Sequence, residues 1–405
     1  MKVKNLIVWA WISWITLAQC LAEKWEEVFL VEQRNHIWWN CYDYFNEDWI
    51  LVHKYWPHIF HTDSEEVRNY VNRFSEFTNY EHKVLGSIDW NLIPIPFNLN
   101  SLYLSFPKWQ AEKLEKALLK YFDYGSRITI RELKGKSESE NDENLSFLAD
   151  YIFEKVFKNY TMKQWWISAK EIDSNVINRV PVAISKDDRY FSHHKYQWMP
   201  VEGYTKMFEK MVDDPKINIY LNTKFNDIKD KIEYEKLYFT WSIDEFFDFK
   251  YWRLWYRRIL YDIETLNIPS YQKNSVVNYP NDYKYTRITE FKKFYPESES
   301  FNCNKTVICR EFPWIWEIDA YPILSKENLK LLERYQKNNK DSNVKFIWRS
   351  WSYSHLDMDK AINQVFEILK KEDNLIRFAW RLWNYGYFSV NKVSEQVFKV
   401  LEKVW

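Results

Sequence analysis

The chain opens with two short apolar runs separated by a longer stretch with helical spacing. These patterns predict a strand at about Lys4 to Val8, a helix at about Ile12 to Lys24, and a second strand at Val28 to Glu32. A strand, a helix and a strand within about thirty residues have the size of a βαβ unit. The start of the chain is therefore expected to form part of a parallel sheet, which a last βα unit from Val344 to Trp348 would join.

The middle of the chain has a different period. Between residues 98 and 188, apolar residues recur every three or four positions, as in KWQAEKLEKALLKYF and NLSFLADYIFEKVFKNY, which predicts helices. The polar segment KGKSESENDEN, residues 134–144, is interpreted as a solvated linker. Later, short apolar runs such as KINIYLN, KLYFTW, YTRITEF and TVICREF predict strands. Together these patterns indicate a nucleotide-binding fold that is split by helical and β-sheet insertions.

Charge and cysteine content narrow the possible partners. The formal net charge is zero and the isoelectric point is about 7.1, so nothing favours nucleic acid or another bulk electrostatic partner. The four cysteines form no CxxC pair, which indicates reduced thiols in a cytoplasmic protein and argues against zinc. His58 and His61 could share a metal, but two histidines in a loop are more often structural, so no metal site is predicted.

The apolar run at the N-terminus also has features of a signal peptide. Lys2 and Lys4 precede it, and LAQC loosely resembles a lipoprotein cleavage site. The run is too short to span a bilayer comfortably, and the charged segment EKWEEVFLVEQ leads directly into the second strand. We therefore favour the βαβ interpretation and expect no stable membrane insertion.

The turn after the first strand carries the clearest candidate chemistry. In dinucleotide-binding folds this turn reads G-x-G-x-x-G, and Trp9, Trp11 and Trp14 occupy the three glycine positions. Glu32 ends the second strand about twenty residues further on, where an acid would bind ribose hydroxyls. The chain has 23 tryptophans, and only 5 glycines where roughly 28 are expected at ~7% usage, which suggests replacement of one by the other. On spacing alone, an ordinary strand, turn and helix with an aromatic face is the simpler alternative.

When these tryptophans are read as glycines, the chain resembles the UDP-galactopyranose mutases along nearly its whole length. The resemblance is carried, in order, by LIVWAWISW, VEQRNHIWWNCYD, HKYWPHIFHTD, NYTMKQW, INRVPV, RYFSHHKYQWMPVEGYTKM, YWRLWYR, YTRITEFKKF, AYPI and RSWSYSHLDMD. Trp165 matches a genuine family tryptophan and Gly203 a family glycine. The family typically has glycine at the positions of Trp9, Trp11, Trp14, Trp38, Trp39, Trp56, Trp166, Trp198, Trp241, Trp252, Trp348 and Trp351.

The resemblance implies an α/β fold with a Rossmann-like FAD-binding domain, an inserted helical domain and an antiparallel β-sheet domain. The FAD-binding domain would be discontinuous and comprise residues 1–80, 200–245 and 325–405. The helical domain, with a mobile loop, would bind substrate and span residues 98–189. The antiparallel sheet domain would combine residues 81–97, 190–199 and 246–324.

The resemblance also implies a flavoenzyme that catalyses no net redox change. The family interconverts UDP-galactopyranose and UDP-galactofuranose, and its FAD must be reduced. The flavin N5 attacks the anomeric carbon to form a covalent sugar adduct and displaces UDP, so the nucleophile belongs to the cofactor. The protein positions the sugar and stabilises the leaving group. The implied partners are the two nucleotide sugars, and we expect a cytoplasmic homodimer.

The residues that would bind FAD follow from matching positions. Glu32 would hold the ribose, Arg34 would pair with the pyrophosphate, and His58 would lie beside the isoalloxazine. The remaining predicted FAD contacts lie in the tryptophan-containing turns and the last βα unit, and are Trp9, Trp11, Trp14, Trp38, Trp39, Asn40, Arg349, Asp357 and Met358.

The substrate residues follow in the same way. Arg179 and Arg287 would bind the diphosphate of UDP, because a guanidinium binds phosphate in a fork, and Glu311 would lie near the sugar. With His58, these three are the predicted catalytic residues. The other predicted substrate contacts are Asn98, Tyr160, Thr161, Trp165, Tyr190, Phe191, Asn278, Tyr321, Tyr353 and His355. His355 stands where the family has a tyrosine, and Tyr353 could supply that hydroxyl instead.

Two further interpretations stay open. A related FAD-dependent oxidoreductase, such as an amine oxidase, shares the first turn, but Arg179, Arg287 and YTRITE speak against it because amines need no diphosphate clamp. The other is an altered chain on the mutase template with impaired FAD binding. A left-handed conformation costs a non-glycine residue roughly 1–2 kcal/mol, and an indole at Trp11 would occupy the space that the pyrophosphate needs.

Overall fold

A computed structural model describes most of the chain. The described residues are 2–9, 11–37, 39–165, 180–239, 241–315, 321–323, 325–339, 343–346 and 357–384. Of the predicted site residues, Trp38, Arg179, Arg349, Tyr353 and His355 lie outside these ranges, as do the side chains of Trp39, Trp165 and Tyr321. Within these ranges, no helix combines the length and apolar character that crossing a bilayer requires.

The first part of the fold is a five-stranded parallel sheet with the order β11-β2-β1-β12-β18. Its strands are β1 (Lys2–Val8), β2 (Val28–Val31), β11 (Ile217–Tyr220), β12 (Glu233–Phe239) and β18 (Val344–Phe346). The central strand β1 is apolar on both faces, and Leu6, Ile7 and Val8 are fully buried. The predicted βαβ unit is confirmed, with α1 (Ile12–Glu23) ending one residue earlier than expected.

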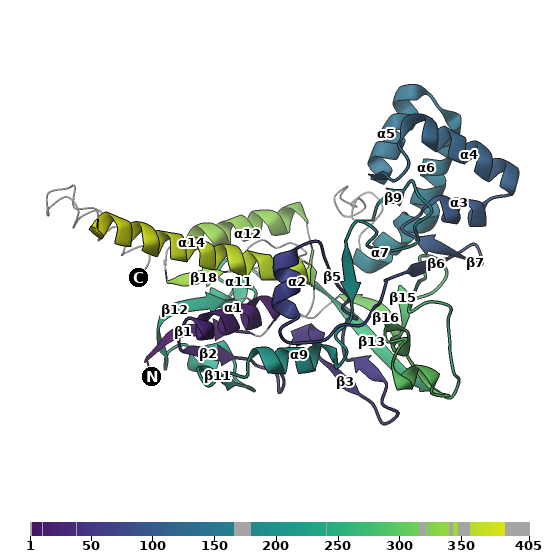
Figure 1. Ribbon diagram of the computed structural model, residues 1–405. Coiled ribbons are helices and arrows are strands. Elements are labelled where there is room, and N and C mark those ends of the chain that lie inside the picture. The colour runs from purple at the N-terminus through teal and green to yellow at the C-terminus, as the bar shows by residue number, and fades with distance from the viewer. Residues whose placement is uncertain are drawn as a thin grey trace.

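Helices surround this parallel sheet. They are α1, α9 (Gly203–Met211), α10 (Phe225–Ile228), α11 (Ile243–Phe246), α12 (Lys326–Asn338) and α14 (Met358–Asn384). Helix α1 packs against both α14 and α9. Figure 1 shows α1, α12 and α14 beside the parallel sheet at one end of the molecule, with α3 to α6 at the other end.

The second part is a seven-stranded sheet with the order β17-β13-β16-β15-β14-β6-β7. Its strands are β6 (Val84–Ile88), β7 (Asn91–Ile95), β13 (Tyr256–Leu266), β14 (Val276–Asn278), β15 (Arg287–Glu290), β16 (Thr306–Ile315) and β17 (Tyr321–Pro322). All of its pairs are antiparallel except β14 with β6, which run parallel. The sheet therefore joins a hairpin from early in the chain to strands that follow more than 150 positions later.

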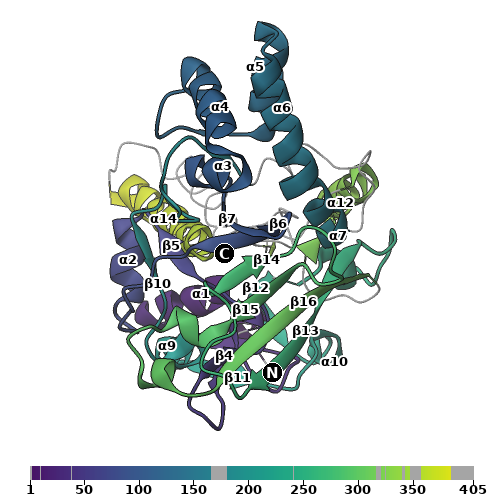
Figure 2. The same cartoon turned by 90° about the vertical axis from the view of Figure 1, so that its right-hand side faces the viewer.

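Helices and two short strands make the third part. They are α3 (Leu99–Ser105), α4 (Lys108–Tyr121), α5 (Ile130–Glu140), α6 (Glu143–Ile152), the π-helical η2 (Phe153–Lys158), α7 (Asn159–Trp165), β8 (Arg127–Ile128) and β9 (Val182–Ala183). Figure 2 shows α4, α5 and α6 standing above the antiparallel sheet. Helix α7 lies at the junction and contacts β16.

The predicted solvated linker at residues 134–144 is wrong, because helix α5 covers residues 130–140. Its charged residues form the exposed side of an amphipathic helix, while Ile130, Leu133 and Ser137 are buried at helical spacing. Thr129 caps the helix by accepting a hydrogen bond from the Glu132 amide, and Glu132 accepts one from the Thr129 amide. Asn141 ends it in a left-handed conformation.

Small elements connect the three parts. They are η1 (Trp39–Cys41), β3 (Asp43–Phe45), β4 (Leu51–His53), β5 (Phe60–Thr62), α2 (Glu65–Val71), β10 (Tyr196–Trp198), η3 (Phe291–Phe294) and η4 (Glu299–Asn302). Strand β3 pairs with β4, and β5 with β10, both antiparallel. The Lys163 side chain joins α7 to the loop between β14 and β15. Its ammonium donates to the carbonyl oxygens of Tyr279 at 2.5 Å and Tyr283 at 3.0 Å, with longer contacts to Asn281 and Tyr285.

Candidate active site

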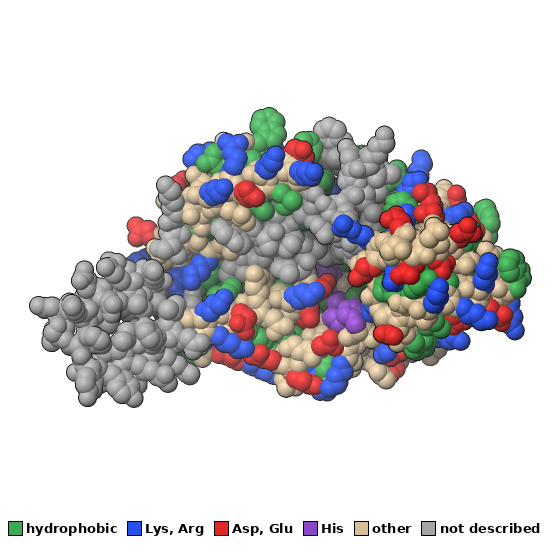
Figure 3. All heavy atoms as spheres, turned by 90° about the horizontal axis from the view of Figure 1, so that it is seen from above, with side chains coloured by type: hydrophobic (Ala, Val, Ile, Leu, Met, Phe, Trp, Pro, Cys, Tyr) green, Lys and Arg blue, Asp and Glu red, His purple; other side chains and the backbone are tan. Residues whose placement is uncertain are grey.

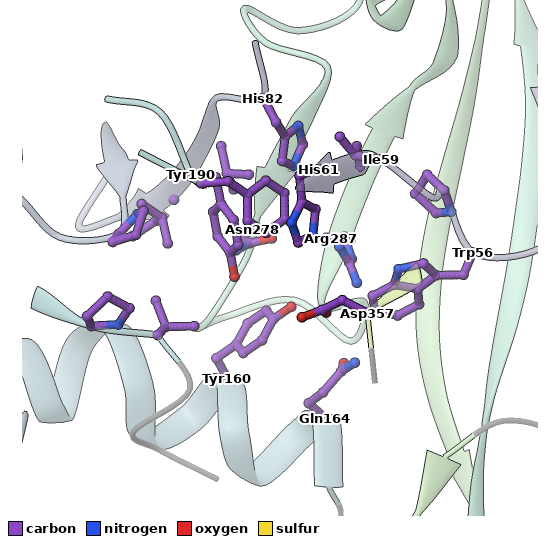
Figure 4. Close-up of a pocket in the computed structure, with 18 of the residues that line it drawn as sticks. Trp56, Ile59, His61, His82, Tyr160, Gln164, Tyr190, Asn278, Arg287 and Asp357 are labelled. Carbon is purple, nitrogen blue, oxygen red and sulfur yellow. The ribbon is translucent and has the colours of Figure 1, made fainter. Parts of the chain in front are cut away.

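A cavity of about 570 Å³ lies where helix α7, the antiparallel sheet and the start of α14 meet (Figure 4). Helix α7 and strands β14 and β15 supply part of its wall, and the segment after β4 supplies another part. Ten of the predicted site residues line it, and they are Trp11, His58, Tyr160, Thr161, Tyr190, Phe191, Asn278, Arg287, Asp357 and Met358. Segments that are far apart in the sequence thus meet around one cavity.

Arg287 is held in this cavity by a buried partner. Register in the sheet pairs Arg287 on β15 with Glu311 on β16, and the Arg287 Nε donates to Glu311 Oε2 at 2.9 Å. Glu311 is fully buried behind the arginine. Burial raises the pKa of the Glu311 carboxyl, and the Arg287 charge opposes that rise. On the other side, the Arg287 guanidinium carbon lies 3.6 Å from the centroid of the Trp56 ring.

The charged groups that line the cavity are mainly positive. Arg127, Arg257, Arg287 and Lys360 face one carboxylate, that of Asp357, among the described lining residues. The buried Arg257 donates its Nη1 to the Gln164 carbonyl oxygen at 2.5 Å, so its position is fixed from helix α7. A cavity with this excess of guanidinium and ammonium groups suits an anionic ligand. Sequence reasoning missed Arg127 and Lys360, whereas the quoted stretch YWRLWYR contains Arg257.

Aromatic rings also line the cavity. The Phe191 ring stacks on His61 with centroids 3.6 Å apart, and Tyr190 meets Phe191 edge-on at 4.9 Å. Burial lowers the pKa of His61 and of His82 to about 3, so both rings are neutral at neutral pH. In the view from above, histidine side chains reach the surface near the middle of the molecule (Figure 3). Tyr160 approaches this wall from helix α7 (Figure 4). Such flat, neutral rings can stack on a planar base.

Asn98 does not line the cavity. Its side chain caps helix α3 by accepting from the Ser101 amide at 2.9 Å. Its amide nitrogen donates to the carbonyl oxygen of Asp187 at 3.1 Å and to Asp188 Oδ1 at 2.9 Å. These bonds use the amide group to hold the helical part together, and they explain why a position matched by sequence does not reach the cavity in this structure.

Glu32, Arg34 and Asn40 form a separate cluster at the end of β2. Glu32 is fully buried and accepts from the Arg34 amide at 2.9 Å, and the Arg34 Nη1 donates to Asn40 Oδ1 at 3.3 Å. None of the three lines the cavity. A dinucleotide bound as in Rossmann folds would have to pass from the cavity to this cluster across the turn between β1 and α1.

That turn is filled by indole rings. Trp9, Trp11 and Trp14 are 5%, 5% and 0% exposed, and Trp9 stacks on Trp241 with ring centroids 4.4 Å apart. Only Trp11 of the three reaches the cavity wall. The described residues therefore provide room at the cavity, where the flavin end of FAD would lie. They do not fit its pyrophosphate, which needs close approach to a glycine backbone.

Two protein-family models match parts of this chain. A family model described as UDP-galactopyranose mutase matches residues 155–355, and one described as an NAD(P)-binding Rossmann-like domain matches residues 12–74. The chain is 33% identical to a probable UDP-galactopyranose mutase of Klebsiella pneumoniae, over 91% of this chain and 94% of the relative. It is also 32% identical to a dTDP-fucopyranose mutase of Escherichia coli, over 90% of this chain and 97% of the relative.

Solved structures give the same architecture. A crystal structure of reduced UDP-galactopyranose mutase superposes with a TM-score of 0.67 at 13% identity, covering 93% of this chain and 94% of the other. A redesigned putrescine oxidase gives a TM-score of 0.53 at 9% identity, covering 92% and 99%. At these identities the structural matches speak for the fold alone, and they confirm the predicted α/β fold with a Rossmann-like part.

Proposed function

The chain belongs to the UDP-galactopyranose mutase family, and on that premise we propose that it interconverts UDP-galactopyranose and UDP-galactofuranose. Members of the family are isomerases, and FAD is the family's cofactor. The observation that carries the substrate proposal is the excess of positive groups in an aromatic-walled cavity. A nucleoside diphosphate matches both features, because its phosphates pair with guanidinium groups and its base stacks on rings.

Arg287 is the residue that we assign to the diphosphate. The buried Glu311 carboxylate fixes the guanidinium through Nε, which orients the group before any ligand arrives. In the proposed reaction the arginine holds UDP after the anomeric bond breaks and until it re-forms. Arg179 and Tyr321 would assist at the same phosphates, as the resemblance predicts. The proposal leaves Glu311 as a positioning residue rather than one that touches the sugar.

The rings supply the base contacts in this proposal. Tyr160, Tyr190 and Phe191 would hold the uracil, and Asn278 would border the sugar from the end of β14. His58 and Met358 would flank the flavin. The part that reduced FAD takes in the reaction stays a prediction, because the described residues do not fit its pyrophosphate end.

The amine oxidase interpretation is disfavoured by the same cavity. A protonated amine would meet Arg127, Arg257, Arg287 and Lys360, and like charges repel. The dTDP-fucopyranose mutase among the relatives marks a second nucleotide sugar that must be tested. We further propose a cytoplasmic homodimer, and the domain boundaries predicted from the sequence stay predictions.

Binding of UDP to the chain tests the proposal without depending on flavin. We expect the double variant Arg287→Gln with Glu311→Gln to bind UDP roughly 10- to 100-fold more weakly, as expected for the loss of a charge-assisted hydrogen bond. Replacing both partners avoids leaving one buried charge alone. Isothermal titration with UDP and with uridine makes the measurement, and uridine affinity should hardly change.

Arg310→Gln is the matched control. It lies next to Glu311 in β16, but its side chain points to the other face and pairs with Asp262 and Glu264. UDP affinity should be unaffected by that change. An unchanged UDP affinity in the double variant would refute the phosphate role. Turnover is then assayed with dithionite on a chain carrying Trp9→Gly, Trp11→Gly and Trp14→Gly, and preference for dTDP-fucopyranose over UDP-galactofuranose would overturn the substrate assignment.

A further inference from the structure

Among the residues that the structure describes, five tryptophans have a backbone conformation that favours glycine. The φ angles are 79° at Trp9, 64° at Trp25, 55° at Trp49, 68° at Trp90 and 133° at Trp252. Among the described residues, the other non-glycine positions with positive φ are aspartates, asparagines and one phenylalanine. No tyrosine is among them, although the chain has 29 tyrosines and 27 phenylalanines. Bulky side chains rarely adopt this conformation, so these tryptophans differ from the other aromatic residues of the same chain.

The C-terminus of α1 shows the pattern in hydrogen bonds. The Trp25 amide donates to the Ala22 carbonyl at 2.9 Å, and the Glu26 amide donates to the Leu21 carbonyl at 3.0 Å. These two bonds define a Schellman motif, in which the left-handed residue after the cap is usually glycine. Trp25 occupies that residue and is 83% exposed. The Lys216 ammonium lies 4.3 Å from the centroid of its ring.

The hairpin between β6 and β7 gives the second case. Ile88 pairs with Asn91, so Asp89 and Trp90 form a two-residue loop, and both have positive φ. A two-residue loop with two positive φ angles is a type I′ turn, for which Asp-Gly is among the strongest sequence preferences. The Trp90 side chain is 91% exposed. The Trp90 indole therefore buries almost no surface that could offset the free-energy cost of the strained backbone.

Two more surface turns repeat the arrangement. Trp49 closes the turn between β3 and β4, where its amide donates to the Asn46 carbonyl at 3.1 Å. Trp252 follows the turn at Phe249, to which its amide donates at 3.1 Å. Their side chains are 74% and 70% exposed. In these turns, as in the two described above, the indole is exposed to solvent at a position whose backbone conformation favours glycine.

Trp9 connects this pattern to the nucleotide turn. It has the same left-handed backbone, but its indole is buried with those of Trp11 and Trp14 in the path that FAD would take. Within the described residues, the Trp14 indole nitrogen has no hydrogen-bond partner although it is buried. Glycine at these positions would empty the path between the cavity and Glu32. One exchange of residue type thus accounts for the surface turns and for the missing fit of the cofactor.

We infer that positions 9, 25, 49, 90 and 252 are glycine in the protein as its own cell makes it. The chain has 5 glycines and 23 tryptophans, so the replacement of glycine by tryptophan affects the whole chain and is not confined to one site. This distribution would result from a single codon that the source cell translates as glycine and that appears as tryptophan in this amino-acid sequence. UGA differs from the tryptophan codon UGG only in its last base and is the candidate. Trp165, which the resemblance matches to a family tryptophan, would then be encoded by UGG.

The protein purified from its source cells tests this directly. Mass spectrometry of peptides spanning residues 25, 49, 90 and 252 should show the mass of glycine at each position, and the peptide with Trp165 should show tryptophan. The gene should carry UGA at the first set and UGG at position 165. Tryptophan at the four turn positions of the native protein would overturn the inference, whatever the enzyme's substrate is.

Stability supplies an independent measurement on recombinant protein. Trp25→Gly, Trp49→Gly, Trp90→Gly and Trp252→Gly should each raise Tm, by roughly 1–2 °C, because each relieves a left-handed conformation without removing buried surface. Trp109→Gly is the matched control, since Trp109 is 69% exposed but lies within helix α4. There glycine should lower Tm. A fall in Tm at all four turns would contradict the geometry on which the inference rests.

Discussion

His53 shows how burial, with a further contribution from the nearby His58, sets the acid response of one residue. Its ring is fully buried and stacks on Phe291 with centroids 5.9 Å apart. Burial lowers its pKa from 6.5 to about 3. Between these values the unfolded chain binds a proton that the folded chain does not, so the free energy of unfolding falls as pH falls. The slope from one such histidine is about 1.4 kcal/mol per pH unit.

We therefore expect His53→Phe to reduce the acid sensitivity of the protein by that slope. Urea unfolding of parent and variant at pH 7, 6 and 5 gives the difference in unfolding free energy, which should shift in favour of the variant as pH falls. His36→Phe is the comparison, because the His36 ring is only half-buried and hydrogen-bonds to the Ile37 carbonyl and the Tyr55 hydroxyl. Parallel stability curves for parent and His53→Phe would contradict the assignment.

Individual site residues also show what the sequence could predict and what it could not. Arg287 and Tyr160 lie in the matched stretches YTRITEFKKF and NYTMKQW, and both line the cavity, as does Asn278, which the resemblance also implied. Arg127 reaches it from β8, and its neighbours in sequence gave no sign of this, because only the packing of the helical part brings it there. The resemblance also implied Asn98, but its side-chain oxygen caps helix α3 by accepting from the Ser101 amide, and its side-chain nitrogen donates to Asp187 and Asp188.

At the scale of elements, the capping box of α5 makes a prediction. Thr129→Ala removes the acceptor for the Glu132 amide and should lower the free energy of unfolding by about 1 kcal/mol. Ser139→Ala is the control in the same helix, where the exposed hydroxyl only contacts the Lys136 carbonyl. Denaturant titration of both variants makes the comparison. Equal stability of the two would mean that the cap contributes nothing.

Some elements were missed because the sequence pattern that would predict them was hidden by other features of the same residues. The βαβ unit could be predicted because its apolar runs are unbroken by turns. The β6–β7 hairpin was not predicted, since Asp89-Trp90 does not read as a turn although its backbone is that of Asp-Gly. Helix α5 was taken for a linker because its charge content dominates, although Ile130, Leu133 and Ser137 keep helical spacing.

At the scale of the whole molecule, charge is balanced overall and concentrated locally. The net charge is zero, yet the cavity collects Arg127, Arg257, Arg287 and Lys360. The attraction for a nucleoside diphosphate should therefore be short-ranged and screened by salt, whose Debye length falls from ~10 Å at 0.1 M to ~3 Å at 1 M. We expect UDP affinity to fall several-fold over that range and uridine affinity to stay constant. Titration calorimetry in NaCl checks this, and equal salt dependence of the two ligands would contradict it.

The Lys163 contacts have a consequence for the order in which the molecule assembles. The ammonium group bonds to carbonyl oxygens that lie 116 or more positions later in the chain, in the loop between Asn278 and Arg287. Local helices form quickly, whereas contacts between distant segments close late in folding. The loop can take its final shape only when helix α7 has docked on the sheet. The cavity, whose wall includes residues of both helix α7 and strand β15, is therefore completed late as the chain folds.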